Sequence, residues 1–563
     1  MLFLKYNLKI IGLVFFVINF LFTSQVKSLD KFDRADRISD YFAGILSFNQ
    51  NEYDTSSKLL RKLDGLELSH PDYSAKYLYS LVNSGKFREA FNFSKKLEIQ
   101  NIDIFESHLI LGIYYIKDSN LDFAKKHFQK AKKKRRSILN DYISNSLYNW
   151  SNLLYSDLDN AILETKKLDD RFENLKKIQS IFLNCYFESS NTKNLYKEII
   201  LNKQTDFSRY NYFYASFVAR SGNIQEAKKI VNSALKSHPR NLKLNQLEAD
   251  LNENKNINIF DCKNAAHVIA EILYITANAL SSQSIYSLSN FYLNLAKFLN
   301  EDFHSFDTLL ADNYYNVDNF EKARKIYKSL SKQGEAYRWF SSKQLARIYL
   351  QERDKDQAIK ILTDAYNNLN KKKIYETFDY AEFLKNNEKF EESIGFYTEI
   401  IKKLKINHPL YAEATDGRGV SYERIGEWDK AEKDLLASLK ADPDQAYVIN
   451  YLAYSWIEQG VKINESLKML EKANKLRSND PYITDSLGWA LFKLKRFEES
   501  KRYLQLAVRL MPGDPIVNDH FGDVLWKNGD KIQARYYWNY VLNLEKTEDD
   551  LKETIEEKLV KGL

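Results

Sequence analysis

The chain has 563 residues, of which 44% are hydrophobic and 28% charged, and it contains only 7 prolines and 17 glycines. This length exceeds what one hydrophobic core usually supports, so we expect several domains or an elongated array of small units. The scarcity of proline and glycine favours long helices over a protein of strands and turns. The net charge of +7 is a small difference between 83 basic and 76 acidic residues, so nothing in it calls for nucleic-acid binding.

The first 28 residues have the organisation of an export signal. Lys5 and Lys9 precede an apolar run from Ile10 to Phe22, and a small-residue cleavage site follows near Ser28. The run is shorter than the roughly 20 residues that a membrane-spanning helix needs. We therefore interpret residues 1–28 as a signal peptide and expect an exported chain, either in the periplasm or associated with the cell envelope. An inner-membrane anchor formed by an uncleaved amino-terminal segment is the alternative.

A period of 34 residues recurs near the carboxyl terminus. Gly488 and Gly522 are 34 residues apart, and so are Pro481 and Pro515. In the unit that begins at Pro481, small residues occupy positions 8, 20 and 27, which are Gly488, Ser500 and Ala507. This pattern resembles that of tetratricopeptide-repeat proteins, whose unit is a pair of antiparallel helices. The resemblance implies that positions 8 and 20 face each other where the two backbones cross.

The same register orders the predicted elements along the chain. Tetratricopeptide-like repeats are expected over 29–138, degenerate helical repeats over 139–303 with one clearer unit at 208–241, a carboxyl-terminal array over 304–548, and a helical tail over 549–563. The small residues that define the last units are Gly419, Ala431, Gly488, Ser500, Ala507, Gly522 and Ala534. The pattern of small residues weakens over 139–207 and 242–303, so we expect a bend or break in the array there.

Proline and glycine support this register independently. All seven prolines fall between units, where a missing amide donor costs little. Five glycines fall at position 15, where the first helix of a unit ends and a left-handed residue is wanted: Gly85, Gly222, Gly426, Gly460 and Gly529. The sequence thus predicts an all-α fold, a tetratricopeptide-repeat solenoid in which antiparallel helix pairs form a right-handed superhelix. Its carboxyl-terminal run is similar to exported alphaproteobacterial repeat proteins of unassigned function.

The resemblance also implies a concave groove lined by positions 2, 5, 9, 12 and 13 of each unit. In the last units these positions carry aromatic, amide and acidic side chains: Tyr447, Asn450, Tyr454, Tyr482, Asp485, Trp489, Phe492, Asp519, Asp523 and Trp526. Aromatic rings beside acceptors suit an extended peptide or a glycan. We expect a neutral or basic segment, because the carboxylates would repel an acidic one. The alternative is that Trp489 and Trp526 pack between units as core.

Motifs for catalysis are absent from the sequence. The eight histidines include no zinc-protease pair, and neither a phosphate loop nor a nucleophile elbow is present, so we predict no catalytic residue, metal or cofactor. His520 is interpreted as a solvated groove residue. Cys185 and Cys262 are interpreted as buried free thiols, with a disulfide as the alternative if the fold brings them together.

The predicted function is a noncatalytic scaffold or adaptor of the bacterial cell envelope, which binds a protein partner in the groove. One alternative is a subunit of machinery that assembles outer-membrane proteins, pili or polysaccharide. A second, from another class, is an accessory protein that holds a glycan for a separate enzyme. The basic run at 132–136 is interpreted as a solvated helix end, and peripheral contact with anionic lipid is its alternative.

Overall fold

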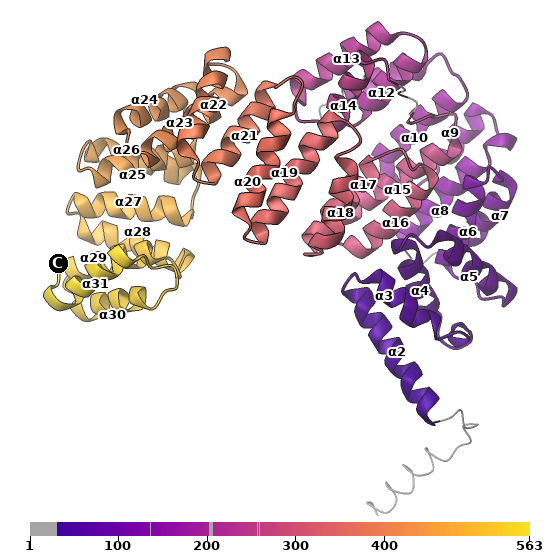
Figure 1. Cartoon of the computed structure of the whole chain (residues 1–563), viewed down its shortest axis with the longest axis horizontal. Coiled ribbons are helices and arrows are strands. Elements are labelled where there is room, and N and C mark those ends of the chain that lie inside the picture. The colour runs from indigo at the N-terminus through magenta and orange to yellow at the C-terminus, as the bar shows by residue number, and fades with distance from the viewer. Residues whose placement is uncertain (1–30, 135–136, 202–206, 256, 258) are drawn as a thin grey trace, which may run out of the picture. The chain divides into compact units, whose positions relative to one another are not determined.

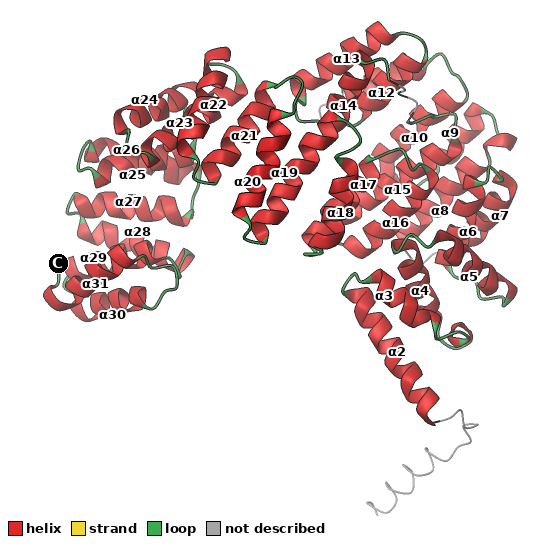
Figure 2. Ribbon diagram, in the orientation of Figure 1, coloured by secondary structure: helices red, strands yellow, loops and turns green. Residues whose placement is uncertain are grey.

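The computed structural model describes residues 31–134, 137–201, 207–255, 257 and 259–563 (Figure 1). The predicted signal peptide at 1–28 lies outside these residues. The chain divides into two compact units, of which unit 1 ends at Asp354 and unit 2 comprises Lys355–Leu563. Throughout the described residues, every regular element is a helix (Figure 2), and the predicted all-α fold is confirmed.

Unit 1 consists of successive helices. Its α-helices and three short 3-10 helices are α2 (Lys31–Asn49), α3 (Tyr53–Arg61), η1 (Leu66–Leu68), α4 (Pro71–Asn83), α5 (Phe87–Ile99), α6 (Phe105–Lys117), α7 (Leu121–Lys132), α8 (Ile138–Ser151), η2 (Leu153–Tyr155), α9 (Leu158–Lys166), η3 (Asp170–Phe172), α10 (Glu173–Tyr186), α11 (Thr192–Ile200), α12 (Tyr210–Arg220), α13 (Ile224–Ser237), α14 (Leu242–Asn252), α15 (Ala265–Ser281), α16 (Tyr286–Leu299), α17 (Ser305–Asn316), α18 (Phe320–Leu330) and α19 (Glu335–Gln351).

Unit 2 continues the alternation of first and second helices and ends on a single helix. Its elements are α20 (Lys355–Asn367), α21 (Ile374–Asn386), α22 (Phe390–Lys403), α23 (Pro409–Arg424), α24 (Trp428–Ala441), α25 (Ala446–Glu458), α26 (Ile463–Leu476), α27 (Pro481–Lys493), α28 (Phe497–Leu510), α29 (Pro515–Lys527), α30 (Lys531–Leu542) and α31 (Asp549–Lys561). The last helix falls within the predicted tail at 549–563.

Helix boundaries lie where the sequence places them. Pro71, Pro409, Pro481 and Pro515 each open a first helix, where proline loses no intrahelical hydrogen bond. The five glycines at position 15 all have positive φ, between 69° and 92°, in the turn after a first helix. This left-handed conformation is strained for other residues, which explains why glycine recurs at this position.

The predicted crossing of the two helices in a unit is confirmed at Gly488 and Ser500. The Ser500 hydroxyl donates a hydrogen bond of 2.7 Å to the carbonyl oxygen of Gly488. A Cβ on Gly488 would lie 2.7 Å from Leu504 Cγ, which is closer than packed atoms allow. The pair α27–α28 therefore packs as closely as it does because position 8 has no side chain.

A further helix pair with the same geometry lies within 242–303, where the pattern of small residues was predicted to weaken. The Ser289 hydroxyl of α16 donates a hydrogen bond of 2.8 Å to the carbonyl oxygen of Ala277 in α15. The two residues are 12 apart, as Gly488 and Ser500 are, and Ala296 occupies position 27 of the same register. The expectation that the pattern of small residues weakens is therefore wrong for α15–α16, which is a regular repeat pair.

The pair α15–α16 packs against the first helices of the amino-terminal repeats. Helix α16 contacts α4 and α6, and α15 contacts α6 and α8. The rings of Tyr79 and Phe291 meet edge to face at 4.6 Å, and the Asn294 side chain donates to that of Asn83 at 3.3 Å. The first-helix face of these repeats, which would line a groove, is thus covered by the chain's own helices.

Candidate functional site

The first helices of unit 2 expose one large side chain from each of three successive units. Tyr447 of α25, Tyr482 of α27 and Ile516 of α29 all stand at position 2, with exposed fractions of 51%, 56% and 43%. We call these three residues the position-2 row. Apolar side chains exposed together on one face of a protein can form an interaction surface.

Neighbouring side chains fix the orientation of Tyr447. Its hydroxyl donates a hydrogen bond of 2.9 Å to Asp480 Oδ2, and the guanidinium of Arg477 lies 4.6 Å from the ring centroid. Asp480 also caps α27 by accepting from the backbone amides of Tyr482 and Ile483. The start of α27 and the Tyr447 ring are therefore held together, so this part of the row is preorganised.

Beside the row lies an acceptor that nothing in unit 2 satisfies. Asn450 is half-buried, and among the described residues its Oδ1 atom has no hydrogen-bond partner. Tyr454, one turn further along α25, is also half-buried. This Oδ1 atom is shielded from solvent, so leaving it without a donor is costly.

Trp489 and Asp485, both predicted to line the groove, are buried instead. The Trp489 ring stacks on His520 with centroids 3.8 Å apart and on the partly buried Phe492 at 4.7 Å. Its indole N–H donates a hydrogen bond of 2.6 Å to Glu458 Oε1. Trp489 thus follows the alternative interpretation, in which it packs between units as core.

His520 is buried and paired with a carboxylate. Its Nδ1 atom lies 2.9 Å from Asp485 Oδ2. Burial alone would lower the pKa of His520, but the carboxylates around it, Asp485 foremost, outweigh burial and raise that pKa. The interpretation of His520 as a solvated groove residue is therefore wrong. The sequence hid this pairing because the two residues are 35 positions apart, on consecutive first helices.

The other two predicted acidic residues bind a lysine from the last helix. Lys558 of α31 donates to Asp519 Oδ1 at 2.6 Å and to Asp523 Oδ1 at 2.8 Å. Burial, reinforced by the neighbouring Asp519, raises the pKa of Asp523 to about 6, although Lys558 opposes the shift. The Trp538 indole also donates to Asp523, at 3.0 Å. This acidic end of unit 2 thus already holds a basic side chain of the chain itself.

Trp526, the last of the predicted groove residues, is half-buried under the end of α31. Lys531 and Arg535 place their charged groups 5.1 Å and 4.8 Å from its ring centroid. The ten predicted groove residues therefore separate into an accessible set on α25 and at the start of α27 and a set engaged within unit 2. Their role in binding a partner stays a prediction.

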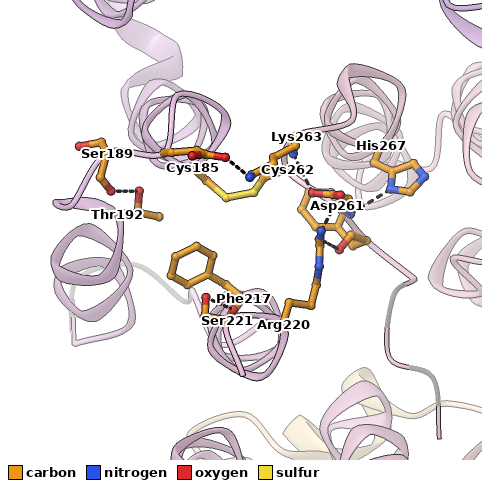
Figure 3. Close-up of a disulfide and its surroundings, with 12 residues drawn as sticks. Cys185, Ser189, Thr192, Phe217, Arg220, Ser221, Asp261, Cys262, Lys263 and His267 are labelled. Carbon is orange, nitrogen blue, oxygen red and sulfur yellow. Dashed lines mark hydrogen bonds and ion pairs between the residues drawn. A yellow bond between two sulfur atoms is a disulfide. The ribbon is translucent and has the colours of Figure 1, made fainter. Parts of the chain in front are cut away.

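Unit 1 contains a disulfide between Cys185 and Cys262 (Figure 3), whose Cα atoms are 6.0 Å apart. The interpretation of two free thiols is wrong, because Cys262, just before α15, lies against Cys185 at the end of α10. Arg220 pairs with Asp261 at 2.5 Å, and the backbone amide of Asp261 donates to His267 Nδ1 at 2.9 Å. A cavity of about 390 Å³ adjoins the disulfide.

The array of helix pairs with small crossing residues defines a helical repeat protein, and comparison with known proteins identifies the repeat. Residues 293–547 match the family model described as tetratricopeptide repeat. A TPR repeat-containing protein of Pseudomonas aeruginosa is 31% identical over 113 residues. That alignment covers 20% of this chain and only 18% of the relative. Residues 293–547 therefore belong to the tetratricopeptide-repeat family, as the sequence pattern predicted.

Solved tetratricopeptide structures align with shorter stretches of the chain. YrrB, described as a TPR protein with an unusual peptide-binding site, is 16% identical and has a TM-score of 0.28. That alignment covers 35% of this chain and 97% of YrrB. MamA of Desulfovibrio magneticus RS-1 is 18% identical with the same TM-score, covering 31% of this chain and 97% of MamA.

In the part of the chain that the structure describes, no group of His, Cys, Asp and Glu side chains is placed to hold a metal ion. Of the helices described, none combines the length and apolar composition required to cross a bilayer.

Proposed function

We propose that the protein is a noncatalytic scaffold of the bacterial cell envelope that binds a protein partner on the first-helix face of unit 2. The tetratricopeptide family supports a role in protein–protein interaction. The observation that carries the choice of surface is the position-2 row of Tyr447, Tyr482 and Ile516, exposed on three successive first helices. The corresponding face of α4, α6 and α8 in unit 1 is covered by α15 and α16.

The chemistry beside the row favours an extended segment that is neutral or basic. Tyr447 and Tyr482 offer exposed aromatic surface on which a partner segment can pack. Glu458 and Asp480 add negative charge close by. Lys558, held by Asp519 and Asp523, exemplifies the kind of side chain that this face accommodates.

An exported location is supported by the disulfide. Paired structural cysteines persist in oxidising compartments such as the periplasm and are rare in the reducing cytosol. The Cys185–Cys262 pair therefore agrees with export directed by residues 1–28. Fractionation of cells, with amino-terminal sequencing of the recovered chain, tests this. A chain that begins near residue 29 in the periplasmic or envelope fraction is expected, and a full-length cytosolic chain would contradict export.

Affinity capture from detergent-solubilised envelopes tests partner binding. The variant Tyr447→Ala/Tyr482→Ala removes the aromatic part of the position-2 row without touching the core. Tyr536→Ala/Tyr540→Ala is the matched control, since these two tyrosines are exposed on the second helix α30. We expect a protein that copurifies with the wild type and the control but is lost from the first variant. Equal recovery with all three chains would refute this binding surface.

A further inference from the structure

Lys243 of α14 is a half-buried lysine whose ammonium lies among aromatic rings of unit 1. Its ammonium lies 3.1 Å from the ring centroid of Phe303 and 4.3 Å from that of Tyr212. Among the described residues, no carboxylate lies within ion-pair distance of it. Faces of aromatic rings attract a cation but leave its three N–H donors without acceptors.

The nearby Arg209 does not share this property, because it has a partner of its own. Its guanidinium donates to both carboxylate oxygens of Glu271, each at 2.7 Å, and Glu271 is fully buried. The guanidinium also lies 3.9 Å from the ring centroid of Tyr274. Because Glu271 is paired with Arg209, it offsets the positive charge of Lys243 only from a longer distance.

An isolated charge inside a protein is expensive to maintain. Burial, together with the repulsion from Arg209, pushes the pKa of Lys243 well below that of a lysine in water. A methionine or leucine would fill the same space on α14 without this cost. The presence of lysine therefore needs an explanation other than packing.

Lys243 borders open space that could hold a ligand. It lines one cavity of about 420 Å³ together with Arg209, Asn241, Tyr274 and Asn278, and a second of about 200 Å³ on its other side. The larger volume is within the range of small-molecule sites in proteins. Asn278 is solvent-exposed, so the larger cavity reaches the surface.

The walls of the larger cavity combine apolar and polar groups. Ile178 and Ile275 supply aliphatic surface, Tyr274 supplies an aromatic ring, and Asn241 and Asn278 supply amide groups. Such walls suit a ligand with an apolar body and a polar end. A lysine ammonium pairs with an anionic group, so Lys243 selects a ligand whose polar end is negative.

We propose that the cavity of about 420 Å³ in unit 1 binds a small organic anion, a carboxylate or a phosphate monoester with an apolar body, whose anionic group pairs with Lys243. The ligand supplies the negative charge and the hydrogen-bond acceptors for the Lys243 ammonium. Arg209 stays paired with Glu271 and contributes the edge of its guanidinium to the wall. This site lies in unit 1 and is independent of the partner surface on unit 2.

Calorimetric titration of the full chain with phenyl phosphate, benzoate and benzyl alcohol tests the proposal. We expect at least one of the two anions to bind and the neutral alcohol not to bind, and the stronger anion identifies the headgroup. Lys243→Met should weaken that binding by roughly tenfold or more, since it removes one partner of a buried charge pair. Lys236→Met, on the exposed part of α13, is the matched control and should bind as the wild type does. Failure of both anions to bind the wild type, or equal binding by Lys243→Met, would overturn the proposal.

Two measurements keep the test valid if a variant folds poorly. Lys243→Met should raise the melting temperature of the unliganded protein, because it replaces a partly desolvated amine by an apolar side chain. A fall would assign Lys243 a structural role instead. In the wild type, reductive methylation read by mass spectrometry needs no variant. Saturating anion should slow modification of Lys243 severalfold and leave Lys236 unchanged. Equal rates at Lys243 with and without anion would contradict the site.

Discussion

Gly488 and Gly395 allow the close helix crossing to be tested with one and the same substitution. Both lie inside helices of unit 2, Gly488 in α27 and Gly395 in α22. A Cβ on Gly488 would lie 2.7 Å from Leu504 Cγ and 3.1 Å from the Leu504 backbone nitrogen, whereas a Cβ on Gly395 would meet nothing within 4 Å. The two sites differ in the space available and share the same helical backbone.

The magnitudes follow from two opposing effects. Replacing glycine by alanine inside a helix stabilises it by about 1 kcal/mol, and this gain applies to both variants. Overpacking a close contact costs about 1 to 3 kcal/mol, and this cost applies only at Gly488. Gly395→Ala should therefore stabilise α22 by about 1 kcal/mol, while Gly488→Ala should leave α27–α28 between unchanged and about 2 kcal/mol less stable.

Hydrogen exchange measured peptide by peptide on the full chain reports these local free energies, because each repeat opens partly on its own. The expected difference between the two variants is about 1 to 3 kcal/mol, since the helix-propensity gain cancels in the comparison. An equal gain in stability at both positions would show that no close crossing exists at Gly488. The assignment of repeat positions along the array would then be wrong.

Three further perturbations have expected outcomes. Lys558→Met leaves Asp523 buried beside another carboxylate, so it should destabilise the end of unit 2 by about 3 to 5 kcal/mol. Hydrogen exchange in α29 and α31 should become faster, and unchanged exchange would contradict the ion pair. On acidification from pH 6 to pH 4, His127 resists protonation in the folded state because burial lowers its pKa to about 4, so α6–α7 should lose protection. Over the same pH range Asp523, with its pKa raised to about 6, binds its proton more readily in the folded than in the unfolded state, so α29 should gain protection. If protection changed in the same direction in α6–α7 and in α29, these two environments would be refuted. Replacing Cys185 and Cys262 with serine should lower the free energy of unfolding by about 2 to 4 kcal/mol and abolish the effect of reductant on the melting temperature. A reductant effect that persists in the variant would contradict a structural disulfide.

Features that depend on a single helix pair could be predicted from the sequence. Gly488 and Ser500 are 12 residues apart, and their contact follows from the register of one unit. The same holds for the glycines at position 15, because a turn is set by its own residues. Ala277 and Ser289 have the same spacing of 12 residues, but no proline or glycine marks the unit over 270–303.

Features that join distant parts of the chain could not be predicted in this way. Asp519 was expected to face a groove because its position in the unit points there, but Lys558 lies on a helix beyond the recognised repeats and covers it. The pairing of Cys185 with Cys262 spans 77 residues and depends on how the α14–α15 connection folds back. The sequence predicts helices over 265–299 but carries no periodic signal that they pack on α4 and α6. Lys243 was missed because no short motif marks a lysine without a partner.

The proposed binding surface for the partner is the exposed first-helix face of unit 2 and not unit 1. Photo-crosslinking in living cells tests it most directly, with a benzoylphenylalanine placed in turn at Tyr482, at Tyr536 on α30 and at Tyr155 in unit 1, all three of them exposed. A protein adduct that forms from position 482 and is absent from positions 536 and 155 is the predicted result. An adduct that forms from position 155 or 536 and not from 482 would contradict the claim.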